Sequence, residues 1–277
     1  MKNVFDFGKY FHQTFPPTPA YIGRILSIAQ GKPRSVREIA DLTGIPQGKS
    51  SGKVVPHLKY AVYMGLIESD ITAPMLTPLG EIIRTEDWAC SEPLTQWLLH
   101  CRLTSCTGAP MWYYFVRMLL NQNQQGISRA YLLEQMQIQF GITKFPPLLT
   151  TYQEFSAIDY LSTDSKTTIA IAPQRIEQNY LYLYGYVLLH EWEAALPRTS
   201  EITADELNAL ACATVLGLTE NQWFEVLEML ASHGICRINK QLSPFTLVRL
   251  ADTQMIIPKL YTLLHSSAFV FTAASCA

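Results

Sequence analysis

Charged residues are scarce in this sequence: they occupy 16% of its 277 positions, whereas hydrophobic residues occupy 48%. That composition excludes a disordered chain, because a chain with little charge and many apolar side chains can bury a core. Apolar runs are also short, and none approaches the roughly 20 residues of a membrane-spanning helix. The first residues contain no apolar stretch of signal-peptide length. We therefore expect a cytoplasmic protein of two or three compact units, with no membrane contact.

Paired cysteines are absent as well. None of the six cysteines belongs to a CxxC pair, which is the usual signature of structural zinc. We therefore expect buried free thiols rather than a metal site. The six are Cys90, Cys101, Cys106, Cys212, Cys236 and Cys276.

A phosphate-binding loop is also missing. Gly48-Lys49-Ser50 has the right ending, but the motif needs four residues between its glycines, and only three separate Gly44 from Gly48. The stretch does not follow an apolar strand either. We expect no nucleotide and no organic cofactor.

Basic charge is concentrated in one segment of the chain. The net charge is −2, yet residues 24–59 contain seven basic and two acidic side chains. This segment carries +5, so the remainder carries −7. Because the distribution of charge matters more than its sum for a polyanionic partner, the segment suits DNA and the remainder does not.

The N-terminal region has the order helix, helix, turn, helix and hairpin, which is typical of a winged helix-turn-helix. Apolar side chains at helical spacing predict a first helix over 19–30. Ser35 and Glu38 match a capping box at the start of the second helix. The third helix should begin near Lys53, because Pro56 is poorly tolerated deep in a helix.

A wing is expected after the third helix. Two short apolar segments, 66–69 and 75–77, flank a turn, and Thr77 followed by Pro78 predicts the start of another helix. In a winged helix the N-terminal end of the third helix faces the major groove. Side chains there and nearby could bind phosphates or base edges. We predict that double-stranded DNA contacts Arg34, Arg37, Gln47, Lys49, Ser50, Ser51, Lys53 and Lys59. A winged helix used for protein contacts, with solvated lysines, is the alternative.

The rest of the chain is expected to be largely helical. Large apolar side chains over 88–120 predict a helical core, and His100 fits that core better than a catalytic site. A weak strand pair is expected near 157–161 and 168–172. Alternating tyrosines from Tyr180 to Tyr186 could form a strand face, but we favour a helix through Trp192.

The opening pattern recurs near the C-terminus. Thr203 to Glu206 is a second capping box, and a helix over 220–232 is followed by another expected wing. Its acidic side chains would repel phosphates, so we expect a protein-docking or homodimerisation unit. The predicted fold is therefore mainly α, with a winged-helix domain (1–87), a helical middle domain (88–196) and a C-terminal winged-helix-like domain (197–277).

Several stretches resemble a known family in the order in which they occur. They are 12–16 (HQTFP), 48–67, 76–80 (LTPLG), 92–100 (EPLTQWLLH) and Trp112-Tyr113. Together they resemble the domain-of-unknown-function 4007 family, and within it the SspB-like components of Ssp-type DNA phosphorothioation systems. The match is good over 5–120 and loose beyond. Gln13 stands where the family usually has an acidic residue, and Pro56 is a second departure.

The resemblance implies a role in replacing a non-bridging phosphate oxygen of DNA with sulfur, as protection against phage. It implies a cysteine desulfurase and ATP-dependent sulfur-transfer proteins as partners. It also implies nicking of DNA, which would use Mg²⁺ or Mn²⁺. A non-catalytic DNA-binding adaptor and a winged-helix transcription regulator are the alternatives.

Catalytic residues are not evident in the sequence. Metal-dependent nucleases hold their metal with carboxylates beside the scissile phosphate, and no restriction-fold motif is present. His190 to Glu193 lacks the second histidine of a zinc-protease helix. Scattered candidates remain, each of which fits a solvated or structural role equally well. They are His12, Asp87, Glu154, Asp159, Glu191 and Glu193.

Overall fold

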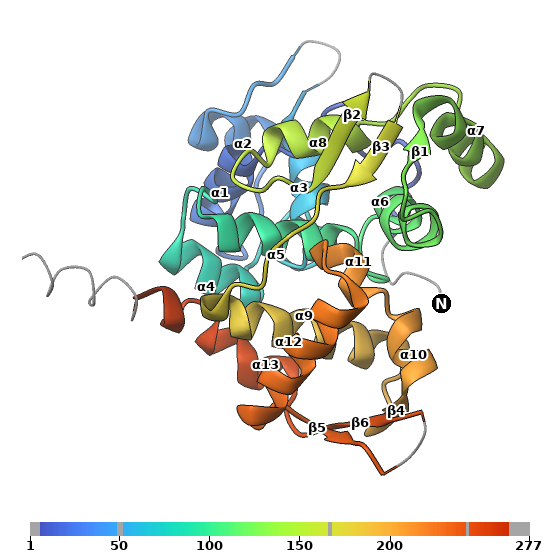
Figure 1. Ribbon diagram of the computed structural model, residues 1–277. Coiled ribbons are helices and arrows are strands. Elements are labelled where there is room, and N and C mark those ends of the chain that lie inside the picture. The colour runs from blue at the N-terminus through green and yellow to red at the C-terminus, as the bar shows by residue number, and fades with distance from the viewer. Residues whose placement is uncertain (1–5, 49–51, 166–167, 242–243, 266–277) are drawn as a thin grey trace, which may run out of the picture. The chain divides into compact units, whose positions relative to one another are not determined.

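The protein is mainly helical, with two small antiparallel sheets, in a computed structural model that describes residues 6–48, 52–165, 168–241 and 244–265 (Figure 1). The chain forms two compact units, residues 1–172 and 173–277. This division differs from the three predicted domains: the predicted boundary after 87 falls inside the first unit. The predicted boundary after 196 also differs, because the long helix before it packs with the second unit.

The first four helices follow the predicted order. They are α1 (Pro19–Ile28), α2 (Val36–Thr43), α3 (Val54–Tyr63) and α4 (Pro78–Glu86). The expected wing is reduced to isolated bridges, which pair Ile67 with Leu76 and Gln30 with Met75.

Local side-chain chemistry sets the starts of these helices. The Ser35 hydroxyl accepts from the Glu38 amide, and the Glu38 carboxylate accepts from the Ser35 amide, so the predicted capping box is confirmed. Lys53 is the N-cap of α3, which places Pro56 in the first turn, where its missing N–H costs nothing. Thr77 caps α4 as predicted, with Pro78 in its first turn.

The remainder of the first unit contains a short π-helix and a three-stranded sheet. Its elements are α5 (Pro93–Leu103), α6 (Pro110–Tyr113), the π-helix η1 (Tyr114–Leu120), β1 (Ile127–Ser128), α7 (Arg129–Phe140), α8 (Leu148–Glu154), β2 (Leu161–Ser165) and β3 (Thr168–Ile171). The predicted strand near 157–161 was placed too early, because β2 only begins at Leu161. Residues 88–120 form helical core as predicted, and His100 is 1% exposed.

The second unit is built around one long helix. Its elements are η2 (Gln178–Tyr180), α9 (Leu181–Ala195), β4 (Glu201–Thr203), α10 (Ala204–Ala209), α11 (Cys212–Leu216), α12 (Glu220–Ser232), β5 (Cys236–Asn239), β6 (Thr246–Arg249), α13 (Thr253–Ile256) and η3 (Ile257–Lys259). The tyrosine-rich segment is a helix, as favoured. The capping box of Thr203 with Glu206 is confirmed, and α12 has the predicted bounds.

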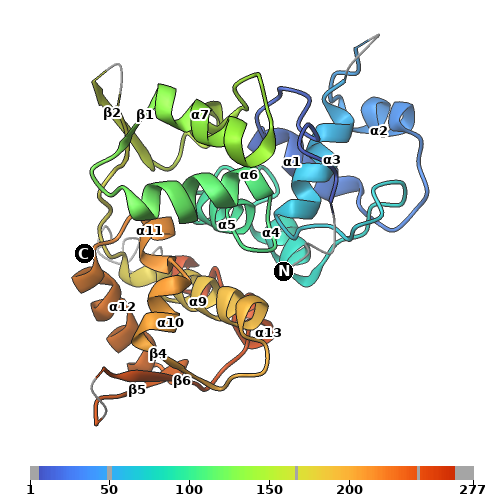
Figure 2. The same ribbon diagram turned by 90° about the vertical axis from the view of Figure 1, so that its right-hand side faces the viewer.

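A similar order of elements occurs three times along the chain: a helix, a pairing segment, two helices and two pairing segments. The last occurrence has three helices at that place, α10, α11 and α12. In both sheets the strand that is last in sequence lies in the centre, giving the orders β1-β3-β2 and β4-β6-β5. The isolated bridges near the N-terminus follow the same rule, because residues 75–76 pair both with Gln30 and with Ile67. Figures 1 and 2 show the sheet of β1–β3, which belongs to the first unit, and the sheet of β4–β6, which belongs to the second.

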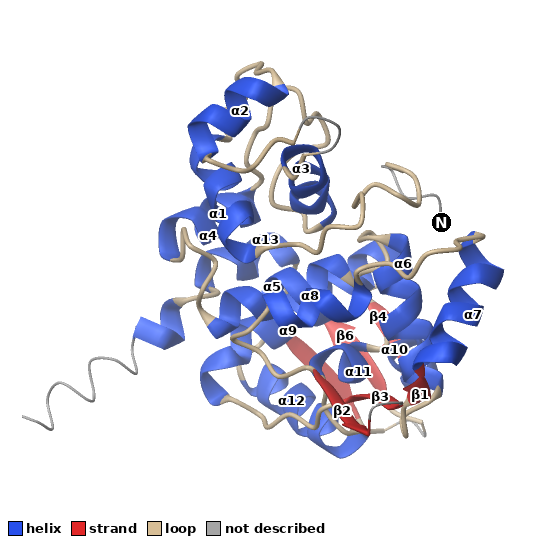
Figure 3. Cartoon of the chain, turned by 90° about the horizontal axis from the view of Figure 1, so that it is seen from above, coloured by secondary structure: helices blue, strands red, loops and turns tan. Residues whose placement is uncertain are grey.

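The segment 6–18, hereafter the arm, packs across α3 and α6 (Figure 3). The ring of Phe11 lies 5.0 Å from that of Tyr60 and 5.8 Å from that of Trp112. The Tyr60 hydroxyl donates to the Phe15 carbonyl. Aromatic edge contacts of this kind add to the burial of apolar area, so the arm is part of the core of the first unit.

This packing covers α3 on nearly every side. Eight of its ten residues are buried, and only Val55 and Lys59 are partly exposed. A helix buried all round is a core element rather than an amphipathic surface helix.

Among the described residues, no helix is both long and apolar enough to cross a membrane.

The backbone carbonyl of Trp88 lies close to Gly23 on α1, and this close approach gives a test of the packing of the first unit. A Cβ added at Gly23 would lie 2.1 Å from the Trp88 carbonyl oxygen. Gly23→Ala should therefore lower the free energy of unfolding by about 1–3 kcal/mol, the usual cost of overpacking. Urea unfolding measures this. Ser27→Ala, at an exposed position on the same helix, is the matched control, and equal stability of the two variants would contradict the close approach.

Candidate nucleic-acid interface

The segment directly before α3 contains most of the predicted DNA contacts. Gln47 pairs with Gly52 in an antiparallel bridge, and the Lys53 amide donates to the Pro46 carbonyl at 2.9 Å. Gln47 is exposed. Three of the predicted residues, Lys49, Ser50 and Ser51, lie outside the described residues. The structure thus brings Gln47 and Lys53 together at the start of α3.

Lys53 joins this segment to the arm. Its ammonium lies over two aromatic rings, 5.6 Å from the ring centre of Phe15 and 5.4 Å from that of Tyr21. Its carbonyl accepts hydrogen bonds from both the amide and the ring of His57. A lysine over a partly exposed ring keeps its charge at the surface.

Tyr21 is the centre of this basic and aromatic group. The guanidinium of Arg24 lies 5.7 Å from the Tyr21 ring centre and donates to the Thr43 carbonyl at 3.4 Å. Arg24 is exposed and Tyr21 partly so. The two cations thus flank one ring that can still reach a ligand.

The same pairing of lysine and ring occurs at two more places on the arm. Lys59 lies 5.3 Å from the ring centre of Phe7, and Lys9 lies 5.4 Å from that of Tyr10, which is 49% exposed. We call this set the arm surface. It comprises Phe7, Lys9, Tyr10, Phe15, Tyr21, Arg24, Lys53 and Lys59.

Sequence reasoning found only part of the arm surface. Lys53 and Lys59 were predicted, whereas Lys9, Arg24 and the four rings were missed. The available signal was the alternation of aromatic and basic residues over 7–15, but nothing local indicates that α3 lies beside it. Arg34 lies elsewhere, with its amide donating to the Thr72 carbonyl, and Arg37 is exposed on α2.

A sharp turn in the arm is the only strained non-glycine pair in consecutive positions among the described residues. Gln13 and Thr14 have φ values of 46° and 71°, which a β-branched residue such as threonine rarely adopts. The Thr14 amide donates to His12 Nδ1 at 2.9 Å, which helps to hold the turn. Both side chains are exposed, so Gln13 faces solvent near the arm surface.

Two buried histidines support the arm in their neutral form. His57 Nε2 accepts from the Thr18 amide at 3.1 Å, which leaves Nδ1 to donate to the Lys53 carbonyl at 2.6 Å. Burial lowers the pKa of His57 to about 4, against the Lys53 backbone hydrogen bond, which raises it; the Lys53 charge lowers it further. Burial also lowers the pKa of His12 to about 4, opposed by the Lys9 backbone. A proton on the accepting nitrogen of either ring would remove the hydrogen bond that it accepts from a backbone amide of the arm.

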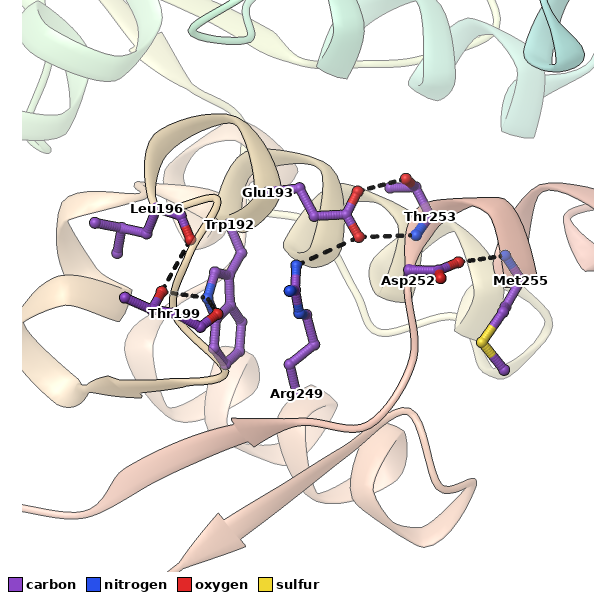
Figure 4. Close-up of polar contacts among 8 residues, drawn as sticks. All are labelled: Trp192, Glu193, Leu196, Thr199, Arg249, Asp252, Thr253 and Met255. Carbon is purple, nitrogen blue, oxygen red and sulfur yellow. Dashed lines mark hydrogen bonds and ion pairs between the residues drawn. The ribbon is translucent and has the colours of Figure 1, made fainter.

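Two of the scattered candidate carboxylates, Glu193 and Asp87, have structural partners. Glu193, on α9, accepts from the Thr253 amide at 3.0 Å and from its hydroxyl at 2.5 Å, and lies 3.5 Å from the Arg249 guanidinium (Figure 4). Asp87 accepts from the amide of Glu92, the N-cap of α5. Among the described residues, no three His, Cys, Asp or Glu side chains are grouped so that they could hold a metal ion.

The family-like motif over 92–100 and the cysteines are core features. The Gln96 side-chain oxygen accepts from the Ala157 amide, and His100 Nδ1 lies 3.0 Å from the Tyr152 hydroxyl. Four of the five described cysteines are buried free thiols, as predicted, while Cys106 is partly exposed and Cys276 lies outside the described residues. Burial raises the pKa of the Cys236 thiol to about 12.

The histidines predict a loss of stability in mild acid. In the unfolded chain both titrate near pH 6.5, and in the folded chain near pH 4. The unfolded chain therefore binds more protons between these values, and the free energy of unfolding should fall as pH drops from 6.5 to 4, by up to about 3 kcal/mol per histidine. Urea unfolding at pH 7.5 and 5 measures this. His57→Asn should reduce the slope, whereas His233→Asn, at an exposed position, should not; an unchanged slope in His57→Asn would contradict the assignment.

Glu193 predicts a structural rather than a catalytic phenotype. Glu193→Ala leaves Thr253 without its acceptors, so the free energy of unfolding should fall by about 1–3 kcal/mol. DNA binding should be unchanged. Glu225→Ala, at an exposed position on α12, is the control and should alter neither quantity. Full stability of Glu193→Ala with loss of activity would instead indicate a functional carboxylate.

The comparisons with known proteins show similarity of fold. No family model and no curated protein matches the sequence. Two solved structures are similar to the chain, each at 14% identity and covering 95% of this chain and 88% of the other. One is a magnesium ion-bound SspB crystal structure, with a TM-score of 0.67, and the other an SspB crystal structure, with a TM-score of 0.59. The predicted resemblance to SspB-like proteins is thereby confirmed as a likeness of structure.

Proposed function

We propose that this chain is a DNA-binding component of a DNA phosphorothioation system and that the arm surface is its DNA contact. The observation that carries the binding site is the gathering of three lysines and Arg24 over the rings of one short segment. Cations neutralise phosphates, and exposed rings between them can stack on bases. The fold shared with SspB supports the placement in a phosphorothioation system.

The repeated element order supports an interpretation as three winged-helix units in tandem. A helix, a strand, two helices and two strands, with the last strand central, is the order of a winged helix-turn-helix. In the first unit the third helix is α3, which is buried. DNA would therefore contact the segment before α3 and the arm rather than side chains along α3.

The second unit suits protein partners better than DNA. In the third winged-helix unit the helix directly before the last two strands is α12, and Glu220, Glu225 and Glu228 are exposed on it. These carboxylates would repel phosphates. We assign this face to docking of a cysteine desulfurase, an ATP-dependent sulfur-transfer protein or a second copy of the chain.

Nicking of DNA is the second candidate function. It is supported by the magnesium ion in one of the similar SspB structures. The described residues do not fit such an ion, because they contain no group of carboxylates and histidines that could hold it. Incubation of supercoiled plasmid with Mg²⁺ or Mn²⁺, with EDTA as control, tests nicking directly. Conversion of the plasmid to open circles, by an activity that co-purifies with the protein, would favour an enzyme. Plasmid that is bound but stays supercoiled would favour an adaptor.

The basic residues before α3 give the main test of DNA binding. Lys49→Ala combined with Lys53→Ala should weaken duplex binding by roughly 10-fold or more at moderate salt and flatten its salt dependence, because fewer counterions are released. Fluorescence anisotropy over a salt series measures both effects.

Lys240→Ala combined with Lys259→Ala is the matched control. It removes the same charge from the second unit, where each lysine also lies over an aromatic ring. Equal losses in the two double variants would show that binding depends on overall charge and not on the arm surface.

A further inference from the structure

A half-open cavity of about 820 Å³ lies in the first unit and is lined by residues of the arm, of α6 with η1, and of the end of α7. Figures 2 and 3 show where α6 and α7 lie in the first unit. None of the roles described above uses it. Large apolar and aromatic side chains dominate its walls. They include Phe11, Met111, Tyr113, Tyr114, Met118 and Phe140.

The π-helix shapes one wall of this cavity. A π-helix widens the backbone turn and shifts the faces that its side chains occupy, and such segments are frequent at functional sites. Within η1, Phe115 and Leu119 are buried in the core, whereas Met118 lines the cavity and is 37% exposed. Tyr114 packs edge-on against Phe140 at 5.6 Å, so two rings from different helices are held together in the wall.

The arm supplies the charged residues of the cavity lining, Asp6 and Lys9. The Lys9 ammonium donates to the carbonyls of Phe140 and Gly141, both at 3.1 Å, and stands at the end of α7. The Asp6 carboxylate accepts from the Gly8 amide at 2.8 Å. Lys9 lines the cavity and also belongs to the arm surface, so one lysine is shared by the two sites.

We propose that this cavity receives an unpaired nucleobase from a DNA strand bound along the arm surface. The proposal rests on the DNA-binding function proposed above. A ring-lined, half-open hollow suits a flat aromatic ligand, and a neighbouring cation suits the phosphate next to that ligand. A base inside a duplex is excluded, because its faces are stacked and its edge is paired.

The burial of α3 favours the same substrate. A winged helix that reads duplex DNA places exposed side chains of its third helix in the major groove. Here only Lys59 and Val55 of α3 are even partly exposed. Contact through rings and lysines of the arm instead needs bases that are accessible from the side of the strand, as in single-stranded or opened DNA.

Three fluorescein-labelled DNA probes test the proposal by anisotropy at about 0.1 M salt: a single strand of about 12 nucleotides, the same strand with abasic residues in its centre, and the matching duplex. The wild-type protein should bind the intact strand about tenfold tighter than the abasic strand, a typical effect of losing base stacking. It should also bind the intact strand tighter than the duplex. Neither comparison depends on a variant.

Met118→Trp fills the opening from an exposed position and should reduce the affinity for the intact strand to that for the abasic strand, with no change for the duplex. Ile138→Trp places the same ring on α7 at a residue that is 70% exposed and does not line the cavity, and it should change nothing. Equal affinity of the wild type for intact and abasic strands would overturn the proposal, as would full strand binding by a folded Met118→Trp.

The outcomes separate this proposal from the one it rests on. Duplex binding that depends on Lys49 and Lys53, without preference for an unpaired strand, would retain the DNA-binding function and overturn only the base cavity. Failure to bind any of the probes would overturn both.

Discussion

The packing of the arm across α3 is the constraint on which the first unit depends. Phe11 fills the space between Tyr60 and Trp112, and hydrogen bonds tie Phe15 to Tyr60 and Thr18 to His57. These contacts join residues about 40 or more positions apart in sequence. Because buried His57 must stay neutral to accept the Thr18 amide, they also link the stability of the unit to pH.

Arm packing also decides which surfaces remain for a ligand. It helps to bury α3, the helix predicted to face a DNA groove, and leaves Gln47 exposed and Lys53 partly exposed. The same arm carries Lys9 to the wall of the cavity lined by η1 and the end of α7. One segment thus covers the expected recognition helix and supplies a different basic and aromatic surface.

The threefold recurrence of one element order places different chemistry on equivalent helices. The helix directly before the last two pairing segments is buried in the first group, where it is α3, whereas in the last group it is α12, which exposes carboxylates. Shared topology therefore does not imply shared binding, and function has to be argued from each exposed face. The likeness to SspB at 14% identity is a likeness of fold and carries no side-chain detail.

Local sequence patterns determined the helices and their limits. The capping boxes at Ser35 and Thr203, and the start of α3 at Lys53, depend on hydrogen bonds within four residues, so they are readable along the chain. The burial of α3, the rings beneath Lys53 and Lys59, and the cavity beside the π-helix were decided only by tertiary structure. Each joins segments that are distant in sequence, and no spacing rule records which apolar face covers another. For the same reason, the sequence indicated where basic charge is concentrated but not the aromatic surface on which it lies.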